Sequence, residues 1–110
     1  MAYDETLAAR MRDLLAKERG VTEKKMFGGL AFLVRGNMAI AASGHGGALV
    51  RCHPEESDAL VASTAAETMV MRGREMSGWL RVPAEQLRTK AQLTKWVGIA
   101  TAYTRSLPAK

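Results

Sequence analysis

The chain has 110 residues, of which 47% are hydrophobic, and its formal net charge is +5. This length fits one domain with its own core, and the apolar content excludes a disordered chain. A single cysteine excludes an intrachain disulfide framework, and no apolar stretch is long enough to cross a membrane. We therefore expect one domain over residues 1–110, located in the cytoplasm and without a membrane partner.

The first predicted element is an amphipathic helix near the N-terminus. Asp4 is a suitable N-cap for this helix, and Gly20 is a suitable residue to end it. Apolar side chains recur at helical spacing and form one stripe, which consists of Leu7, Met11, Leu14 and Leu15. The stripe predicts a helix that packs one face against the core.

The middle of the chain is predicted to form three antiparallel strands, over residues 23–34, 38–42 and 48–52. The first strand is expected to bend at Gly28-Gly29, because two consecutive glycines favour a bulge or bend. The residues between the strands are rich in Gly, Asn and Ser, which are typical of turns. Short connections of this kind join antiparallel neighbours.

The second half is predicted to contain two helices and two strands. One helix begins at Pro54, and the strands cover residues 68–71 and 79–82. Thr89 and Gln92 have the spacing of a capping box at the start of the last helix. The apolar stripe of that helix consists of Leu93, Trp96, Val97, Ala100, Tyr103 and Leu107. The order α-β-β-β-α-β-β-α predicts an α+β two-layer sandwich, with helices packed on an antiparallel sheet of about five strands.

The excess of positive charge is confined to the last third of the chain. Residues 1–71 hold eight Lys/Arg and nine Asp/Glu, whereas residues 72–110 hold eight Lys/Arg and two Asp/Glu. A basic surface attracts phosphate groups, so direct binding of nucleic acid, DNA included, is one functional hypothesis. Its candidate contacts are Arg72, Arg74, Arg81, Arg88, Lys90 and Lys95. The alternative is an ordinary solvated surface, because these residues are spaced singly and form no dense run.

Trp79 lies in a predicted strand near Arg74 and Arg81, and an aromatic strand with nearby arginines can stack nucleic-acid bases. Aromatic residues make up only 5% of the chain, however, and they do not alternate with basic residues as in known RNA-binding motifs. We therefore expect Trp79 to be a core residue.

No catalytic or metal-binding pattern is recognisable. Cys52 could be combined with His45, His53 or Glu55, but these spacings match no zinc signature. Cys52 and His53 are also adjacent, so their side chains should point to opposite faces of a strand. We therefore expect a buried core cysteine, no metal, no cofactor and no enzymatic activity. A small enzyme or ligand binder that uses Cys52, His53 and the methionine-rich last hairpin is a third hypothesis.

Several segments form a recognisable pattern. The most specific is Lys24-Lys25-Met26-Phe27-Gly28-Gly29-Leu30-Ala31-Phe32, and it is followed by Gly36-Asn37-Met38-Ala39. Supporting segments are Met76-Ser77-Gly78-Trp79 with Val82, and Ser106-Leu107-Pro108. Together these segments resemble the TfoX N-terminal domain family, also called Sxy, and the resemblance covers almost the whole chain.

The resemblance implies a fold like that of secretion chaperones, and a possible homodimer by analogy with those chaperones. It also implies a role like that of competence and transcription regulators. Within the family, the chain is expected to be a stand-alone, single-domain member. The family supplies no established catalytic residues, so none is expected here. Our leading prediction is a non-enzymatic regulatory domain that binds a protein partner such as the transcription machinery, with direct nucleic-acid binding as the alternative.

Overall fold

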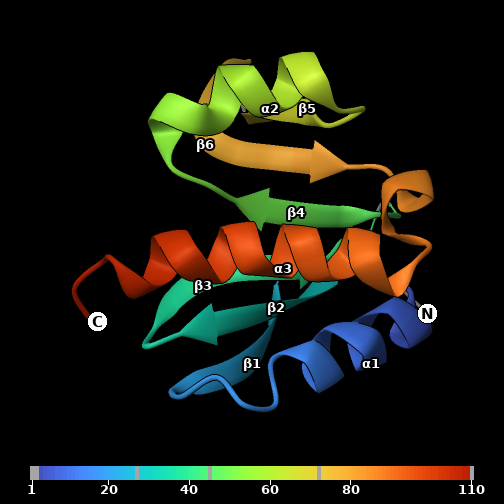
Figure 1. Cartoon of the computed structure of the whole chain (residues 1–110), viewed down its shortest axis with the longest axis vertical. Coiled ribbons are helices and arrows are strands. Elements are labelled where there is room, and N and C mark those ends of the chain that lie inside the picture. Colours follow the sequence, from blue (N-terminus) through green and yellow to red (C-terminus); the bar gives the residue numbers. More distant parts are fainter. Residues whose placement is uncertain (1–2, 27, 45, 72, 110) are drawn as a thin grey trace.

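The computed structural model describes residues 3–26, 28–44, 46–71 and 73–109, and it shows a helix layer on an antiparallel sheet (Figure 1). The helices are α1 (Glu5–Leu14), α2 (Ser57–Ser63) and α3 (Lys90–Arg105), with short 3₁₀ turns η1 (Pro54–Glu56) and η2 (Ala84–Leu87). The strands are β1 (Val21–Met26), β2 (Gly29–Val34), β3 (Asn37–Ala42), β4 (Ala48–Arg51), β5 (Glu67–Met71) and β6 (Arg74–Val82). Within these residues the strand order is β1-β2-β3-β4-β6-β5.

The predicted α+β two-layer architecture is confirmed, but the sheet has six strands where about five were expected. The segment 23–34 is not one bent strand. Met26 pairs with Gly29 and the chain reverses between them, which separates β1 from β2. Gly28 lies in this reversal with a φ of +76°, a conformation that residues with side chains rarely adopt. The element order is therefore α-β-β-β-β-α-β-β-α.

Both predicted N-terminal helix caps are present. The Asp4 carboxylate accepts a hydrogen bond from the Leu7 N–H at 3.1 Å, which satisfies one free donor at the start of α1. At the start of α3, Thr89 Oγ1 accepts from the Gln92 N–H at 3.1 Å, and Gln92 Oε1 accepts from the Thr89 N–H at 3.0 Å. These reciprocal bonds are the capping box that the sequence predicts.

The first helix is shorter than predicted. It ends at Leu14, so the expected end at Gly20 is wrong. Turns follow the helix, and in them the Glu18 N–H donates to the Leu15 carbonyl at 3.0 Å. The carbonyl of Gly20 accepts a hydrogen bond from the Arg35 N–H at 2.9 Å, so Gly20 connects this loop to the β2–β3 turn instead.

The core lies between the sheet and the helix layer. Its largest fully buried side chains include Met11, Phe32, Ile40, Leu80 and Trp96. Trp79 is only half-buried, so the prediction that it is a core residue is wrong. Its neighbour Leu80 on β6 is buried in the core, and because successive side chains alternate, Trp79 points to the other face of the strand. The predicted stripe of α3 is buried except at its end, at Tyr103 and Leu107.

All three helices lie on the same side of the sheet (Figure 1). Helix α3 packs across β3 and β4, α1 contacts β3 and α3, and α2 contacts β5 and β6. The other side of the sheet carries no helix within the described ranges. No helix in those ranges is long and apolar enough to span a bilayer.

Candidate functional site

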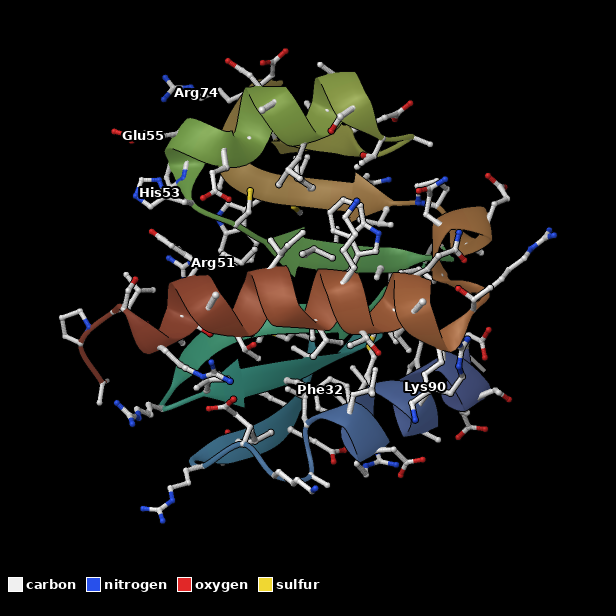
Figure 2. The ribbon with its side chains drawn as sticks, viewed as in Figure 1. Phe32, Arg51, His53, Glu55, Arg74 and Lys90 are labelled. Carbon is white, nitrogen blue, oxygen red and sulfur yellow. The ribbon has the colours of Figure 1, made fainter. Side chains whose placement is uncertain are left out.

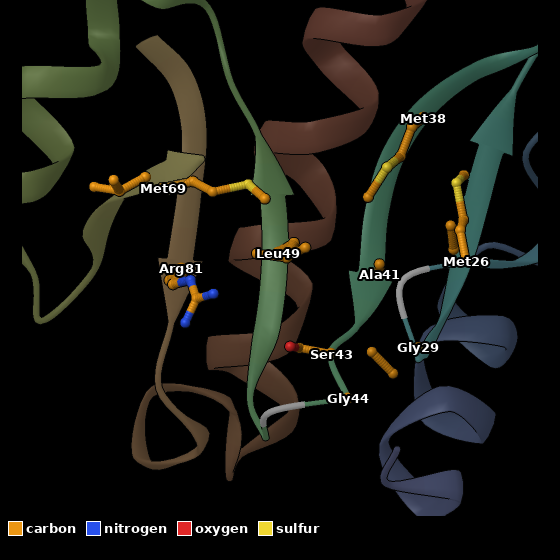
Figure 3. Close-up of a pocket in the computed structure, with 12 residues that line it drawn as sticks. Met26, Gly29, Met38, Ala41, Ser43, Gly44, Leu49, Met69 and Arg81 are labelled. Carbon is orange, nitrogen blue, oxygen red and sulfur yellow. The ribbon is translucent and has the colours of Figure 1, made fainter. Parts of the chain in front are cut away.

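The sheet face opposite the helices is lined mainly by apolar side chains. Successive residues of a strand point to opposite faces, so residues next to core positions point away from the helix layer. Figure 3 shows these side chains in front of the strands, with α3 behind. We call this surface the open face and define it by Met26, Ala31, Met38, Ala41, Leu49, Met69 and Arg81.

One row of side chains crosses all six strands at the open face. Direct cross-strand pairs connect, in order, Lys24, Ala31, Ala41, Leu49, Arg81 and Glu67. A basic residue therefore stands at one end of the row, and two alanines and a leucine form its middle. An arginine and a glutamate form the other end. The register of the sheet thus fixes the spacing between the apolar and the charged groups.

The middle of this row lies in a shallow pocket of about 200 Å³. Ala31 and Ala41 are 1% and 5% exposed although they face away from the helices, because longer side chains surround them. The half-exposed neighbours that line the pocket are Met26, Met38, Leu49 and Met69. Met69 also pairs in register with Met76 of the last hairpin. Unbranched methionine side chains rearrange easily, so the pocket can adapt to different apolar groups.

Arg81 is the charged residue that lines this pocket. It is exposed, and Figure 3 shows it on the β6 side of the pocket. The described residues form two ion pairs, Arg12–Glu23 and Glu18–Arg105, and Arg81 takes part in neither. Its guanidinium donors are therefore available to an incoming carboxylate or phosphate.

The basic residues predicted as nucleic-acid contacts come from several regions of the molecule. Arg74 begins β6 next to the β5–β6 turn, and Arg81 lies near the other end of that strand. Figure 2 shows Arg74 and Lys90 on opposite sides of the molecule. Arg72 lies outside the described residues. The described members of this set do not form one continuous basic face.

The three remaining predicted contacts lie in or next to α3. Arg88 precedes the helix, and its carbonyl accepts a hydrogen bond from Arg10 Nη2 at 3.0 Å. Lys90 is the first residue of the helix. The Lys95 ammonium lies 5.5 Å from the centroid of the Trp96 ring, a cation–π distance. All three basic side chains are exposed, and Figure 2 shows Lys90 at the helix layer.

Sequence analysis missed a cluster of aromatic and basic side chains that joins β4, β6 and α3. The Arg51 guanidinium lies 4.9 Å from the centroid of the Trp79 ring and 5.4 Å from that of Tyr103. The ring of His53 meets Tyr103 edge-on, with the centroids 5.5 Å apart. Arg51 and Trp79 are register partners on β4 and β6, a pairing that no local sequence signal reveals.

A groove of about 450 Å³ lies beside this cluster, between η1 and the end of α3. Its lining residues are His53, Glu56, Gly98, Ile99, Ala102, Tyr103 and Ser106. Nδ1 of His53 accepts a hydrogen bond from the Glu55 N–H at 3.1 Å and so caps η1 (Figure 2). This histidine therefore has a structural task at the start of the turn.

Cys52 and His53 do not form a catalytic pair. Cys52 is completely buried, whereas His53 is exposed, as expected for neighbours on an extended segment. Burial raises the pKa of the Cys52 thiol, and the negative charge of Glu56 raises it further, so the reactive thiolate is disfavoured. His45 lies outside the described residues. Among the residues that are described, no three His, Cys, Asp or Glu side chains are grouped as a metal site requires.

Residues 13–103 match the family model of the TfoX N-terminal domain, which confirms the resemblance carried by the sequence motifs. No curated protein and no solved structure matches the chain at a significant level. The matched range includes the whole sheet and therefore every residue that lines the open-face pocket.

Proposed function

The chain belongs to the TfoX N-terminal domain family, and we propose that it is a non-enzymatic regulatory domain that acts by binding a protein partner. The observation that carries this proposal is the open face, an apolar sheet surface that no helix in the described ranges covers. A component of the transcription machinery is the partner class that fits the resemblance to competence and transcription regulators.

The composition of the open face supports protein binding. An antiparallel sheet with one face in water normally alternates apolar and polar side chains. Here β2 and β3 are apolar on both faces, because Phe32 and Ile40 face the helices while Ala31 and Ala41 face outward. The methionines and Leu49 of this face are partly exposed, and each Å² of apolar surface that a partner removes from water contributes about 25 cal/mol.

Direct nucleic-acid binding through the basic last third is the alternative function. It requires several cations that neutralise neighbouring phosphates together. The described basic residues from Arg74 to Lys95 are distributed over β6, the turn before α3 and α3 itself, and of these Arg81 lines the open-face pocket. This distribution favours protein binding over phosphate-backbone binding.

The proposal is tested by capture of proteins on the immobilised domain from a nuclease-treated extract of its source cells. Leu49→Asp places a charge on the open face, and Thr94→Asp places the same charge on the exposed side of α3 as a control. We expect Leu49→Asp to retain about tenfold less partner than the wild type or Thr94→Asp, because an unpaired charge in an interface opposes binding.

Circular dichroism and thermal unfolding check that each variant is folded, and Met38→Lys is a second open-face variant. Equal retention of the same proteins by Leu49→Asp, Met38→Lys and the wild type would contradict the proposal. The same preparations are titrated with a labelled duplex at low and physiological salt. The alternative function would be established by two results together. The affinity for the duplex would fall steeply with salt, and no captured protein would be lost on the Leu49→Asp or Met38→Lys substitution.

A further inference from the structure

We infer that the segment of the partner that docks on the open face carries a carboxylate next to an apolar anchor side chain. The inference rests on the proposed function and names the chemistry of its partner. It follows from two features of one surface, a pocket that suits an apolar side chain and, among the described residues that line it, one cation without an ion pair.

The pocket has the size of a site for a side chain. Its volume of about 200 Å³ is smaller than the roughly 300–1,000 Å³ that is typical of small-molecule sites. Its floor is formed by Ala31 and Ala41, and methionines line its sides. An apolar group can therefore enter without covering a charged side chain. Methionine-lined surfaces are used elsewhere to accept apolar anchors of varied shape.

The charge beside the pocket selects an acidic group. Arg81 is the direct cross-strand partner of Leu49, so its guanidinium lies next to the apolar part of the row. It forms no ion pair with Glu67, its neighbour on β5, among the interactions of the described residues. A carboxylate can bind a guanidinium through two parallel hydrogen bonds, which gives both energy and orientation.

A phosphate-rich ligand fits this surface less well. The next cation of the same row is Lys24, four strands away from Arg81, or about 19 Å at the usual strand spacing. Arg51, two residues beyond Leu49 on β4, has its guanidinium over the Trp79 and Tyr103 rings. Among the described residues that line the pocket, Arg81 is the cation, and a single carboxylate beside an apolar anchor needs only one. Charge complementarity thus favours an acidic protein segment.

The test uses two fluorescein-labelled synthetic peptides of 14 residues. One contains leucine, alanine and glutamate, and the other has glutamine at every glutamate position. Fluorescence anisotropy measures their affinity for the wild type, Arg81→Gln, Arg81→Glu and the control Arg88→Glu, which reverses an exposed charge on the helix side. We expect the wild type and Arg88→Glu to bind the acidic peptide about tenfold more tightly than the glutamine peptide. Both Arg81 variants should lose this preference.

Equal affinity for the two peptides, no binding of the acidic peptide, or an unchanged preference in the Arg81 variants would each overturn the inference. Sedimentation of the free domain is measured at the same concentrations, and a dimer that excludes the acidic peptide would also overturn it. The proposed function is judged separately. If Leu49→Asp loses a captured partner that Arg81→Glu retains, the protein-binding role stands and the acidic preference fails.

Discussion

Glu18 and Arg105 connect the loop after α1 to the end of α3. Arg105 Nε donates to the two carboxylate oxygens of Glu18 at 3.0 and 3.1 Å, and Nη2 of the same arginine also donates. Arg12 binds Glu23 at the start of the sheet in the same two-pronged manner, at 2.6 and 2.7 Å. Hydrogen bonds from the arginines lower the pKa of both carboxyl groups.

The lowered pKa of Glu18 predicts that stability depends on pH. A carboxyl group whose pKa is lower in the folded state adds stability above its unfolded pKa, and this contribution is lost as the pH falls. We expect the free energy of unfolding to fall below about pH 4.5, and Glu18→Gln to make that fall smaller. Urea unfolding at about pH 7 and about pH 3 measures the difference.

Glu85→Gln is the control for this measurement, because it removes a carboxylate that belongs to neither ion pair. Its pH dependence should match that of the wild type. If Glu18→Gln also keeps the full pH dependence of the wild type, the Glu18–Arg105 pair does not stabilise the fold as described.

The capping box predicts a measurable effect of one hydroxyl group. Thr89→Ala removes the acceptor for the Gln92 N–H at the start of α3, so we expect the free energy of unfolding to fall by about 1 kcal/mol. Thr94→Ala makes the same chemical change on the exposed side of that helix and should alter stability by about 0.5 kcal/mol or less. Equal effects of the two substitutions in urea unfolding would exclude a capping role.

The β1–β2 hairpin brings Gly29 against the neighbouring strand. A Cβ atom on Gly29 would lie 2.3 Å from the carbonyl oxygen of Ala42, whereas one on Gly98 of α3 would have no atom within 4 Å apart from the local backbone of its own helix. Gly29→Ala should therefore destabilise the domain by about 1–3 kcal/mol through overpacking. Gly98→Ala should stabilise it by up to about 1 kcal/mol, because alanine favours the helix.

Thermal unfolding of the two glycine variants measures the expected stabilisation and the expected destabilisation in one experiment. A higher melting temperature is expected for Gly98→Ala, and a lower one for Gly29→Ala. An unchanged melting temperature for Gly29→Ala would show that the strands separate freely at this point, contrary to the described packing.

The elements that sequence analysis predicted well are those with local signals. The apolar stripes of α1 and α3 and the caps at Asp4 and Thr89 depend on residues within a few positions of one another. The hairpin at Gly28 was predicted as a bend, because a glycine pair alone does not distinguish a bulge from a reversal of the chain. The placement of Trp79 failed because the inward face of a strand depends on register, which tertiary packing sets.

The open face is a property of the whole molecule. Its central row joins residues from all six strands, and the crossover that places β6 between β4 and β5 brings Arg81 next to Leu49. The sequence places methionines in the last hairpin, but it does not show that Met69 lines one pocket with Ala31 and Ala41 across the sheet. The sequence shows how many positive charges the last third carries. Only the fold shows that these charges are separated, with some on β6 and others on α3.

Photo-crosslinking in living cells measures directly whether the open face contacts a protein. The crosslinker p-benzoylphenylalanine is incorporated in place of Met38, which lines the pocket, or in place of Thr94, which is exposed on α3. We expect ultraviolet light to join the Met38 position, and not the Thr94 position, to a distinct protein. Adducts that are as abundant from Thr94 as from Met38, or adducts with nucleic acid alone, would contradict the assignment of the open face as a protein-binding surface.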